Sequence, residues 1–257
     1  MSGILYVIAT PIGNMEDLTD RAKRTLSEVT LVAAEDTSNT SKIFKHLGIG
    51  NKMSSNHKFN ELKRTDSFIK ILENGQDIAL VSDAGTPCIS DPGAILVKAC
   101  IDRAIKVESI PGPSSVIAAL SISGISFDKF IFYGFLPKEA KAIKEIIIEA
   151  SNQNKTACVF FESPKRIIKT ISLLNDEIPE AQVCLCNDLT KMYERIYRGK
   201  PRDILAELLD NPSAGKGEYT IVIECGFDGK LADTDEVPLS LEAVIIDHII
   251  KNGVSIK

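Results

Sequence analysis

The sequence of 257 residues predicts an α/β fold of two domains, with a mostly parallel N-terminal sheet and a mixed C-terminal sheet. First, short runs of β-branched residues alternate with helical patterns, which is typical of doubly wound parallel sheets. Second, the last predicted strands lie close together in the sequence, which favours some antiparallel pairing. Third, the length is near the upper limit for one hydrophobic core. We place the domains at 1–120 and 121–228, followed by a linker and a C-terminal helix at 229–257.

The N-terminal half contains four short apolar runs that predict buried strands. They are Ile4–Ala9, Leu31–Ala34, Ile78–Val81 and Val107–Ile110. Leu18, Ala22 and Leu26 recur at helical spacing, and the acidic pair Glu16-Asp17 suits the start of that helix. The segments Asp91-Pro92 and Gly112-Pro113-Ser114 each predict the start of a further helix, because a capping residue stands beside a proline.

The C-terminal half predicts a second series of strands and helices. The strands are Phe130–Tyr133, Ala157–Phe161, Gln182–Cys186, Arg195–Tyr197 and Tyr219–Glu224. Ser163-Pro164 predicts the start of a helix whose apolar face consists of Ile167, Ile168, Ile171 and Leu174. The polar segment Asp228–Pro238 indicates a linker, and Leu241–Ile250 predicts an amphipathic helix. The residues after it are either a tail cut short or a naturally frayed end.

The composition is typical of a globular cytoplasmic protein. Hydrophobic residues make up 44% and charged residues 25%, which excludes the collagen-like and disordered classes. The six cysteines lie mostly in apolar runs without a C-x-x-C pair, so we expect buried, reduced thiols. Cys184-x-Cys186 has no histidine within ligand spacing, and we expect no metal site. The sequence has no signal-peptide or membrane-spanning pattern, so we expect no membrane association.

The net charge of −5, taken alone, argues against a nucleic-acid partner. However, the segment 187–202 carries five basic and two acidic residues, a net charge of +3. Two further basic runs are Lys138, Lys141 and Lys144, and Lys63-Arg64. Such runs are either solvated surfaces or contacts to an RNA backbone, and the sequence leaves both interpretations open.

Three loops that follow predicted strands are rich in glycine and proline: Ala9–Asn14, Ser82–Gly93 and Pro111–Ser115. Ligands of open α/β sheets bind beyond the carboxyl ends of the strands, where these loops meet, so we expect a binding cleft there. The loops contain neither G-x-x-x-x-G-K-[ST] nor G-x-G-x-x-G, and they lack lysine. A neutral or zwitterionic adenosyl ligand therefore fits better than a nucleotide phosphate.

Eight motifs occur in an order that identifies a family. They are Ala9-Thr10-Pro11-Ile12-Gly13-Asn14 with Asp17-Leu18-Thr19, Ala33-Ala34-Glu35-Asp36-Thr37, Ser82-Asp83-Ala84-Gly85-Thr86-Pro87, Asp91-Pro92-Gly93, Pro111-Gly112-Pro113-Ser114, Gly134-Phe135-Leu136-Pro137, Phe161-Glu162-Ser163-Pro164 with Arg166, and Leu189-Thr190-Lys191. Over about residues 3–225 they resemble the ribosomal RNA small-subunit methyltransferase I family, a branch of the tetrapyrrole methylase superfamily.

The resemblance implies transfer of a methyl group from S-adenosylmethionine to the ribose 2′-hydroxyl of a cytidine in small-subunit (16S) rRNA. It also implies two α/β domains with the cofactor in the cleft between them, and a homodimer. The expected partner is the rRNA within the 30S particle.

The resemblance assigns the cofactor to residues of three loops and of one segment that closes over the adenosyl group. They are Pro11, Ile12 and Gly13 at the floor of the cleft, Asp83, Gly85, Thr86 and Pro87 in the second loop, Ser114 and Ser115 in the third, and Leu136 and Pro137 in the closing segment. For Asp83 a role as a turn residue bonded to its own backbone stays open.

Methyl transfer to a hydroxyl needs a group that takes the hydroxyl proton, and positioning contributes most of the rate. The candidates for catalysis are Asp188, Glu35 and Glu162, together with Lys191. For Glu35 and Asp36, capping of a helix that begins near Thr37 is an equally open interpretation. Asn187-Asp188 replaces the usual Arg-Glu pair of the family, which puts the role of Asp188 in doubt.

Two other departures concern histidines, since Lys165 and Phe59 stand where the family has histidine. A histidine base is therefore in doubt, and His57 is consistent with a solvated loop residue. We expect RNA contacts from Asp36, Asn60, Arg166, Arg195, Arg198 and Lys200.

Two other functions remain open. A precorrin-type tetrapyrrole C-methyltransferase on the same fold needs only a compact pocket, whereas RNA requires exposed cations around the cleft. A non-catalytic RNA-binding assembly factor is compatible with the altered Asn187-Asp188 pair, because a fold does not guarantee its chemistry.

Overall fold

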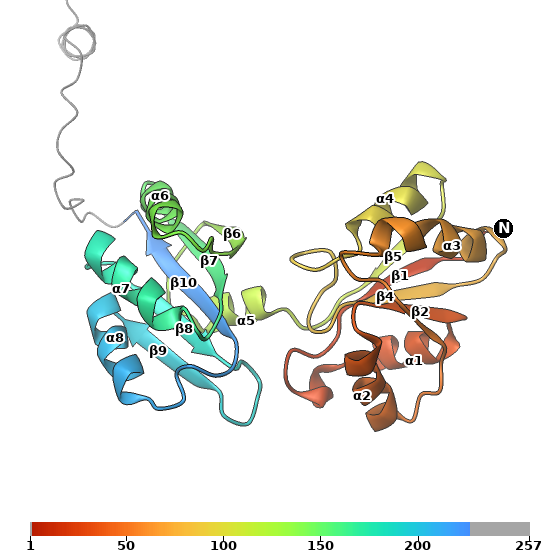
Figure 1. Ribbon diagram of the computed structural model, residues 1–257, viewed down its shortest axis with the longest axis horizontal. Coiled ribbons are helices and arrows are strands. Elements are labelled where there is room, and N and C mark those ends of the chain that lie inside the picture. Colours follow the sequence, from red (N-terminus) through yellow and green to blue (C-terminus); the bar gives the residue numbers. More distant parts are fainter. Residues whose placement is uncertain (1, 227–257) are drawn as a thin grey trace, which may run out of the picture.

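The computed structural model describes residues 2–226, which form two α/β domains lying side by side (Figure 1). Each domain is built on one five-stranded sheet with helices on both faces. The predicted fold class is confirmed, because the N-terminal sheet is parallel and the C-terminal sheet is mixed. In the described residues, no helix has both the length and the apolar composition needed to cross a bilayer.

The N-terminal sheet has the order β3-β2-β4-β1-β5, and all its neighbouring strands are parallel. The strands are β1 (Leu5–Ile8), β2 (Leu31–Ala34), β3 (Met53–Ser55), β4 (Ile78–Val81) and β5 (Val107–Ile110). Because parallel strands end at the same edge, the loops after β1, β4 and β5 lie next to one another. This edge faces the C-terminal domain.

Two separate cores cover the faces of this sheet. Helices α1 (Asp20–Glu28) and α2 (Thr37–Leu47) bury Leu26 and Phe44 on one face. Helices α3 (Glu61–Glu73) and α4 (Ala94–Asp102) bury Phe68 and Leu96 on the other. Each fully buried side chain of this size contributes about 1.5–3 kcal/mol to folding. A short 3-10 turn, η1 (Met15–Asp17), precedes α1.

The C-terminal sheet has the order β6-β7-β10-β8-β9, in which only β6 and β7 are parallel. The strands are β6 (Lys129–Phe135), β7 (Thr156–Glu162), β8 (Val183–Asn187), β9 (Arg195–Gly199) and β10 (Tyr219–Cys225). Helices α6 (Ala140–Ser151), α7 (Ile167–Glu177) and α8 (Pro201–Asp210) cover one face. The antiparallel pairs explain why the last strands are so close in the sequence.

Helix α5 (Ser115–Ile122) covers the other face of the C-terminal sheet. Its Val116, Ala119 and Leu120 pack in one core with Val159 and Val222. The sequence-based domain boundary near residue 120 therefore falls inside a helix that packs with the second domain. We propose that the boundary lies in the preceding loop, at residues 111–114.

Most predicted helices and strands are present, but some of them begin at other residues than the local sequence motifs predicted. The first helix begins at Asp20 behind Thr19, whose hydroxyl accepts the Ala22 N–H, whereas Glu16 and Asp17 lie in η1. The strand β3 was not predicted, because three residues without a β-branched side chain carry little signal.

Helix α4 begins at Ala94 with Gly93 as its N-cap, so the prediction that Asp91 caps it and Pro92 opens it was wrong by two residues. Glu61 caps this helix from α3, and its Oε1 accepts the N–H groups of Gly93 and Ile95 at 2.8 and 3.0 Å. In α7, Ile168 is 38% exposed, so it lies outside the apolar face to which the sequence assigned it. The predicted linker and C-terminal helix lie outside the described residues.

Candidate functional site

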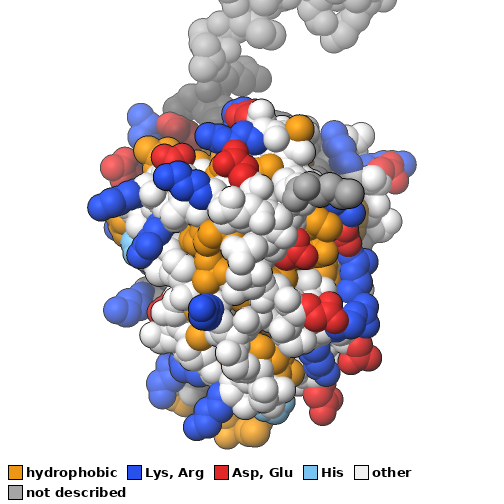
Figure 2. Space-filling model, turned by 90° about the vertical axis from the view of Figure 1, so that its right-hand side faces the viewer, with side chains coloured by type: hydrophobic (Ala, Val, Ile, Leu, Met, Phe, Trp, Pro, Cys, Tyr) orange, Lys and Arg blue, Asp and Glu red, His pale blue; other side chains and the backbone are white. Residues whose placement is uncertain are grey.

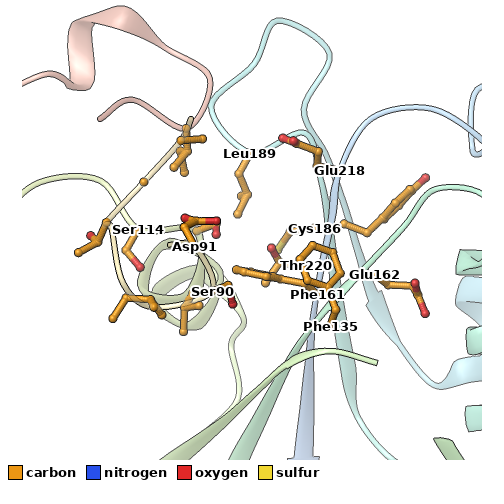
Figure 3. Close-up of a pocket in the computed structure, with 18 of the residues that line it drawn as sticks. Ser90, Asp91, Ser114, Phe135, Phe161, Glu162, Cys186, Leu189, Glu218 and Thr220 are labelled. Carbon is orange, nitrogen blue, oxygen red and sulfur yellow. The ribbon is translucent and has the colours of Figure 1, made fainter. Parts of the chain in front are cut away.

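A cavity of about 320 Å³ lies between the two domains, which is within the range of small-molecule sites (Figure 3). The N-terminal domain contributes the loops after β1 and β4, and the start of α5 lines the cavity where the two domains join. The C-terminal side contributes the ends of β6, β7 and β8 and the start of β10. The lining residues are Ile12, Ala84, Gly85, Thr86, Ile89, Ser90, Asp91, Ser114, Ser115, Val116, Phe135, Phe161, Glu162, Ser163, Pro164, Cys186, Leu189, Glu218, Tyr219 and Thr220.

The loops after β1 and β4 are joined by backbone hydrogen bonds. Thr10 and Gly85 exchange two N–H···O bonds of 2.9 Å each, and the Thr10 hydroxyl donates to the Ser82 carbonyl. The third loop is tied in as well, because the Thr86 hydroxyl donates to the Pro113 carbonyl at 3.2 Å. These bonds hold the three loops together as one wall of the cavity, as the sequence predicted.

Gly85 needs its lack of a side chain for conformational reasons. Its φ of +75° lies in the left-handed region, which L residues rarely adopt. A Cβ atom there would also lie 3.4 Å from Ile12 Cγ2. Because 3.4 Å is an ordinary contact distance, it is the left-handed backbone that requires glycine at this position.

Ser114 and Ser115 lie at the start of α5. The Ser114 hydroxyl accepts the Ile117 N–H at 3.5 Å, which makes Ser114 the N-cap as predicted. Both serines line the cavity, so the N-terminus of α5 faces it. This end of a helix favours negatively charged ligand groups.

Of the other predicted cofactor residues, six do not line the cavity, and Gly13 among them is exposed. Pro11 and Pro87 are buried within the loops. Asp83 accepts the N–H of Asp36 and the Asn39 amide, both at 3.0 Å, so it joins the loops after β2 and β4. Leu136 is buried and Pro137 is half-buried, directly after the lining residue Phe135.

Glu162 and Arg166 form an ion pair of 2.6 Å, in which the carboxylate is completely buried. The carboxylate also accepts the Thr170 hydroxyl at 2.8 Å. Figure 3 shows that Glu162 lies at the edge of the cavity with its carboxylate turned away from Asp91. Because both oxygens are engaged, we infer that Glu162 is not the proton acceptor that the sequence suggested.

Lys191 lies between two carboxylates at the β8–β9 loop. Its Nζ donates to Asp188 Oδ1 at 2.6 Å and to Glu218 Oε2 at 2.8 Å. Burial lowers the pKa of this ammonium, but the hydrogen bonds and charges of the two carboxylates outweigh burial and leave it raised. Lys191 therefore carries its proton at neutral pH, so it is a cation here and not a base.

The loop after β8 has an unusual backbone. Asp188 and Thr190 have φ angles of +52° and +65°, which are uncommon for residues other than glycine. The Thr190 hydroxyl oxygen is buried without a hydrogen-bond partner among the described residues. Strained residues cluster at functional sites. Leu189, between these two residues, lines the cavity.

Glu35 and Asp36 follow β2, and the structure separates their roles. Asp36 is the N-cap of α2 and accepts the Ser38 N–H at 2.7 Å, which lowers its pKa. The capping interpretation therefore applies to Asp36. Glu35 accepts the Asp83 N–H at 3.3 Å, and burial raises its pKa, with further increases from Asp91, Asp83 and Asp36.

Asp91 is a lining carboxylate that sequence reasoning treated only as a helix cap. Figure 3 shows it beside Ser90 on the N-terminal side of the cavity, opposite Phe135 and Phe161. Burial raises its pKa, and the neighbouring Asp83 raises it further. The signal available in the sequence was the Asp91-Pro92-Gly93 motif, which belongs to the family pattern but received no role at the site.

The residues predicted to bind RNA make different contacts within the protein. Arg166 is used inside the C-terminal domain, Asn60 bonds to Ser55 and His57, and Arg198 donates to the Ile122 carbonyl at the end of α5. Lys200 pairs with Glu180, whereas Arg195 is exposed without an ion-pair partner among the described residues. Within 187–202, carboxylates outside the segment thus pair with Lys191 and Lys200, whereas Arg195 and Arg198 keep uncompensated positive charges among the described residues.

The surface charge is mixed in the same way. Figure 2 views the molecule from the N-terminal side, where basic side chains are spread around the periphery with acidic ones between them. Lys144 of the second basic run pairs with Glu177. Individual cations, such as Arg195, are therefore better candidates for RNA contacts than a continuous basic field.

The lining of the cavity suits the adenosyl part of S-adenosylmethionine. Ile12, Phe161 and Leu189 offer apolar surface for an adenine ring.

The cysteines contribute no metal site to the described part of the chain, where no group of three or more His, Cys, Asp or Glu side chains is placed to hold a metal ion. Cys100, Cys158, Cys184, Cys186 and Cys225 are buried, and Cys88 is half-buried. Burial raises the pKa of Cys88 and Cys100 to about 11, so both are thiols at neutral pH.

Comparison with known proteins shows the family and the fold of the chain. Residues 4–205 match the family described as Tetrapyrrole (Corrin/Porphyrin) Methylases. Two solved structures share the fold. The methyltransferase CobJ has a TM-score of 0.64 at 16% identity and covers 87% of this chain and 95% of its own. Uroporphyrin-III-C-methyltransferase from Thermus thermophilus has a TM-score of 0.58 at 17% identity, with 86% and 94% covered.

Curated relatives are more similar in sequence. The Buchnera aphidicola protein is 40% identical over all of this chain and 88% of its own length, and the Haemophilus influenzae protein is 36% identical over all of this chain and 89% of its own. A Streptococcus pyogenes relative is 42% identical over 86% of this chain and 76% of its own. All three are named ribosomal RNA small subunit methyltransferase I. These comparisons confirm the resemblance inferred from the motifs, and with it the expectation of an S-adenosylmethionine-dependent methyltransferase. The chain belongs to the tetrapyrrole methylase family, in the group that these relatives represent.

Proposed function

We propose that this protein transfers the methyl group of S-adenosylmethionine to the ribose 2′-hydroxyl of a cytidine in small-subunit rRNA. The observation that carries the proposal is the similarity over nearly the whole chain to relatives named as small-subunit rRNA methyltransferases. The interdomain cavity, with its apolar walls and the carboxylate of Asp91, supports it. When bound, the cofactor supplies the methyl group on a sulfonium, from which it is displaced by the hydroxyl oxygen.

The protein contributes positioning and a proton acceptor. Among the described residues, three carboxylates line the cavity, and two of them are paired: Glu162 with Arg166, and Glu218 with Lys191. Asp91 has no ion-pair partner in this part of the chain. We therefore assign the role of proton acceptor for the 2′-hydroxyl to the carboxylate of Asp91. Its raised pKa lies closer to neutral pH than that of an ordinary aspartate, which favours a general base.

The Asn187-Asp188 departure does not remove the charge arrangement at this loop. Asp188 accepts both the Lys191 ammonium and the Glu218 N–H, at 2.6 and 3.2 Å. The shorter acid thus still holds Lys191 at the rim of the cavity. This observation favours a catalytic protein over an assembly factor that has lost its chemistry.

The decisive experiment measures methyl incorporation from labelled S-adenosylmethionine into three substrates: purified 30S particles, free small-subunit rRNA and a tetrapyrrole. We expect label in the 30S particles, on a cytidine 2′-oxygen after nuclease digestion and mass spectrometry. Label in the tetrapyrrole alone would contradict the proposal. Cofactor binding without label in any of the three would favour the assembly factor.

We further propose that the protein acts in the cytoplasm, where small subunits are assembled, and that it is a homodimer. Both follow from the resemblance. Sedimentation equilibrium at micromolar concentration tests the second, and a mass equal to the 28.0 kDa monomer would contradict it.

A further inference from the structure

The buried ion pair of Glu162 and Arg166 connects two segments at the wall of the cavity. Glu162 is the last residue of β7, and its carboxylate is fixed by Arg166, by the Thr170 hydroxyl and by the Ser163 N–H. A fully buried carboxylate is costly unless it is paired and hydrogen-bonded. Here every contact serves to hold the guanidinium of Arg166 in one position.

The outer side of that guanidinium holds the segment after β6. Arg166 Nη1 donates to the Pro137 carbonyl at 2.7 Å and Nη2 to the Leu136 carbonyl at 2.9 Å. The planar guanidinium can reach two neighbouring carbonyls at once, which an ammonium cannot do with the same geometry. The side chain of Arg166 is 27% exposed, so these bonds are partly shielded from water.

This segment needs such an anchor because it leaves the regular sheet. The β6–β7 register shifts between Phe132 and Phe135, and Gly134 has a φ of +71°. A bulge of this kind redirects the following side chain. Phe135 lines the cavity, contacts the ring of Phe161 edge-on at 5.4 Å between centroids, and remains 63% exposed. After Phe135, the β6–β7 backbone contact is a single bond of 3.3 Å from Leu136 N to the Phe161 carbonyl.

We propose that Glu162 and Arg166 form a positioning unit for the cofactor, which holds residues 135–137 as a preformed wall of the cavity. Neither residue touches the reacting atoms. The inference rests on the proposed function, in that the cavity is taken to bind S-adenosylmethionine. It replaces the sequence-based roles of Glu162 as a base and Arg166 as an RNA contact.

The test is calorimetric binding of S-adenosylmethionine and of S-adenosylhomocysteine to the full chain and its variants. Arg166→Lys keeps the positive charge beside Glu162 but loses the double contact, so we expect about tenfold weaker binding of both ligands. Removal of one partner of a buried pair can unfold a protein. The double variant Glu162→Gln with Arg166→Met leaves no buried charge, and we expect the same loss from it while circular dichroism stays native.

Glu177→Gln is the matched control, since Glu177 pairs with Lys144 on the helices α6 and α7 and does not line the cavity. It should bind both ligands like the wild type. Binding of a small-subunit rRNA fragment, measured without cofactor, should change less than about twofold in Arg166→Lys.

Each outcome bears on one claim. Wild-type affinity for the cofactor in folded Arg166→Lys and in the folded double variant would overturn the inference, and so would a loss confined to RNA binding. If the wild type itself binds no S-adenosylmethionine, the proposed function fails instead.

Discussion

Gly13 of the N-terminal domain lies against Lys191 of the C-terminal domain so closely that a Cβ atom on Gly13 would be 2.5 Å from Lys191 Cγ. The same atom would lie 2.8 Å from the Leu189 carbonyl oxygen and from the Thr190 hydroxyl. Real Cβ atoms do not come this close to other heavy atoms. The tip of the β1 loop therefore needs glycine so that the two walls of the cavity can approach one another.

We predict that Gly13→Ala moves the β1 loop away from Leu189 and opens the cavity. Ile12 and Leu189 both line the site, so we expect binding of S-adenosylmethionine to weaken about tenfold, as measured by calorimetry. Gly50→Ala is the control, because a Cβ there meets no heavy atom within 4 Å. Equal cofactor affinity in the two variants would show that the close approach does not shape the site.

We predict that Asp91→Asn abolishes the acidic limb of the pH–rate profile. A base must be ionised, so wild-type turnover should rise with pH through the raised pKa of Asp91 and then level off. The asparagine variant should be slower by about 10²- to 10⁴-fold and should have no such limb. Cofactor affinity reports on folding of the site, and Asp102→Asn on α4 controls for the charge change. If the acidic limb of the pH–rate profile is unchanged in Asp91→Asn, another group accepts the proton.

The periodicity of the sequence was sufficient to predict the scaffold of the site. The runs Ile78–Val81 and Val107–Ile110 are strands with the predicted bounds, and parallel pairing brings their following loops to one edge. Ile12, Gly85, Thr86, Ser114 and Ser115 line the cavity for this reason. These residues follow directly from strand ends, and strand ends are encoded locally.

Long-range polar contacts could not be predicted in this way. Arg166 bonds to carbonyls 29 and 30 residues earlier, and Glu61 caps a helix that starts 33 residues later. In the sequence these two side chains are indistinguishable from surface charges, because neighbouring residues do not indicate which distant backbone groups need a hydrogen-bond partner. The ion pairs of the basic run 187–202 were not predictable either, because the partners Glu218 and Glu180 are distant in the sequence from Lys191 and Lys200.

We predict that Glu35→Gln stabilises the protein at neutral pH. Burial raises the pKa of Glu35 in the folded state above the ordinary value of 4.5, so ionised Glu35 destabilises the fold. Below pH 4.5 the carboxyl is neutral in both states and has no such effect. As the pH rises, the unfolded chain loses its proton first, and above the folded pKa the destabilisation is complete.

Thermal unfolding at several pH values checks this. The difference in melting temperature between Glu35→Gln and the wild type should be near zero at pH 4 and should grow to a plateau at neutral pH. Glu28→Gln, which replaces an exposed carboxyl on α1, is the control. A variant less stable than the wild type at pH 7 would mean that the bond from the Asp83 N–H outweighs burial.

We predict that two arginines on β9 have different functions although they are three residues apart. Arg195 is exposed and has no ion-pair partner in residues 2–226, so Arg195→Ala should weaken rRNA binding and reduce its salt dependence by about one released ion. Arg198 donates to the Ile122 carbonyl through Nε and Nη2, at 3.1 and 2.7 Å. Arg198→Ala should instead lower the stability by an amount on the order of 1 kcal/mol.

Filter binding of an rRNA fragment between low and moderate salt, together with urea unfolding, separates the two effects. The slope of log affinity against log salt concentration should change only in Arg195→Ala. The urea concentration at the unfolding midpoint should change only in Arg198→Ala. Because both variants remove one positive charge from the same strand, each serves as the control of the other. If the salt dependence of RNA binding changes equally in the two variants, RNA responds to the net charge of this strand. The hydrogen bonds of Arg198 to α5 would then not prevent it from contacting RNA.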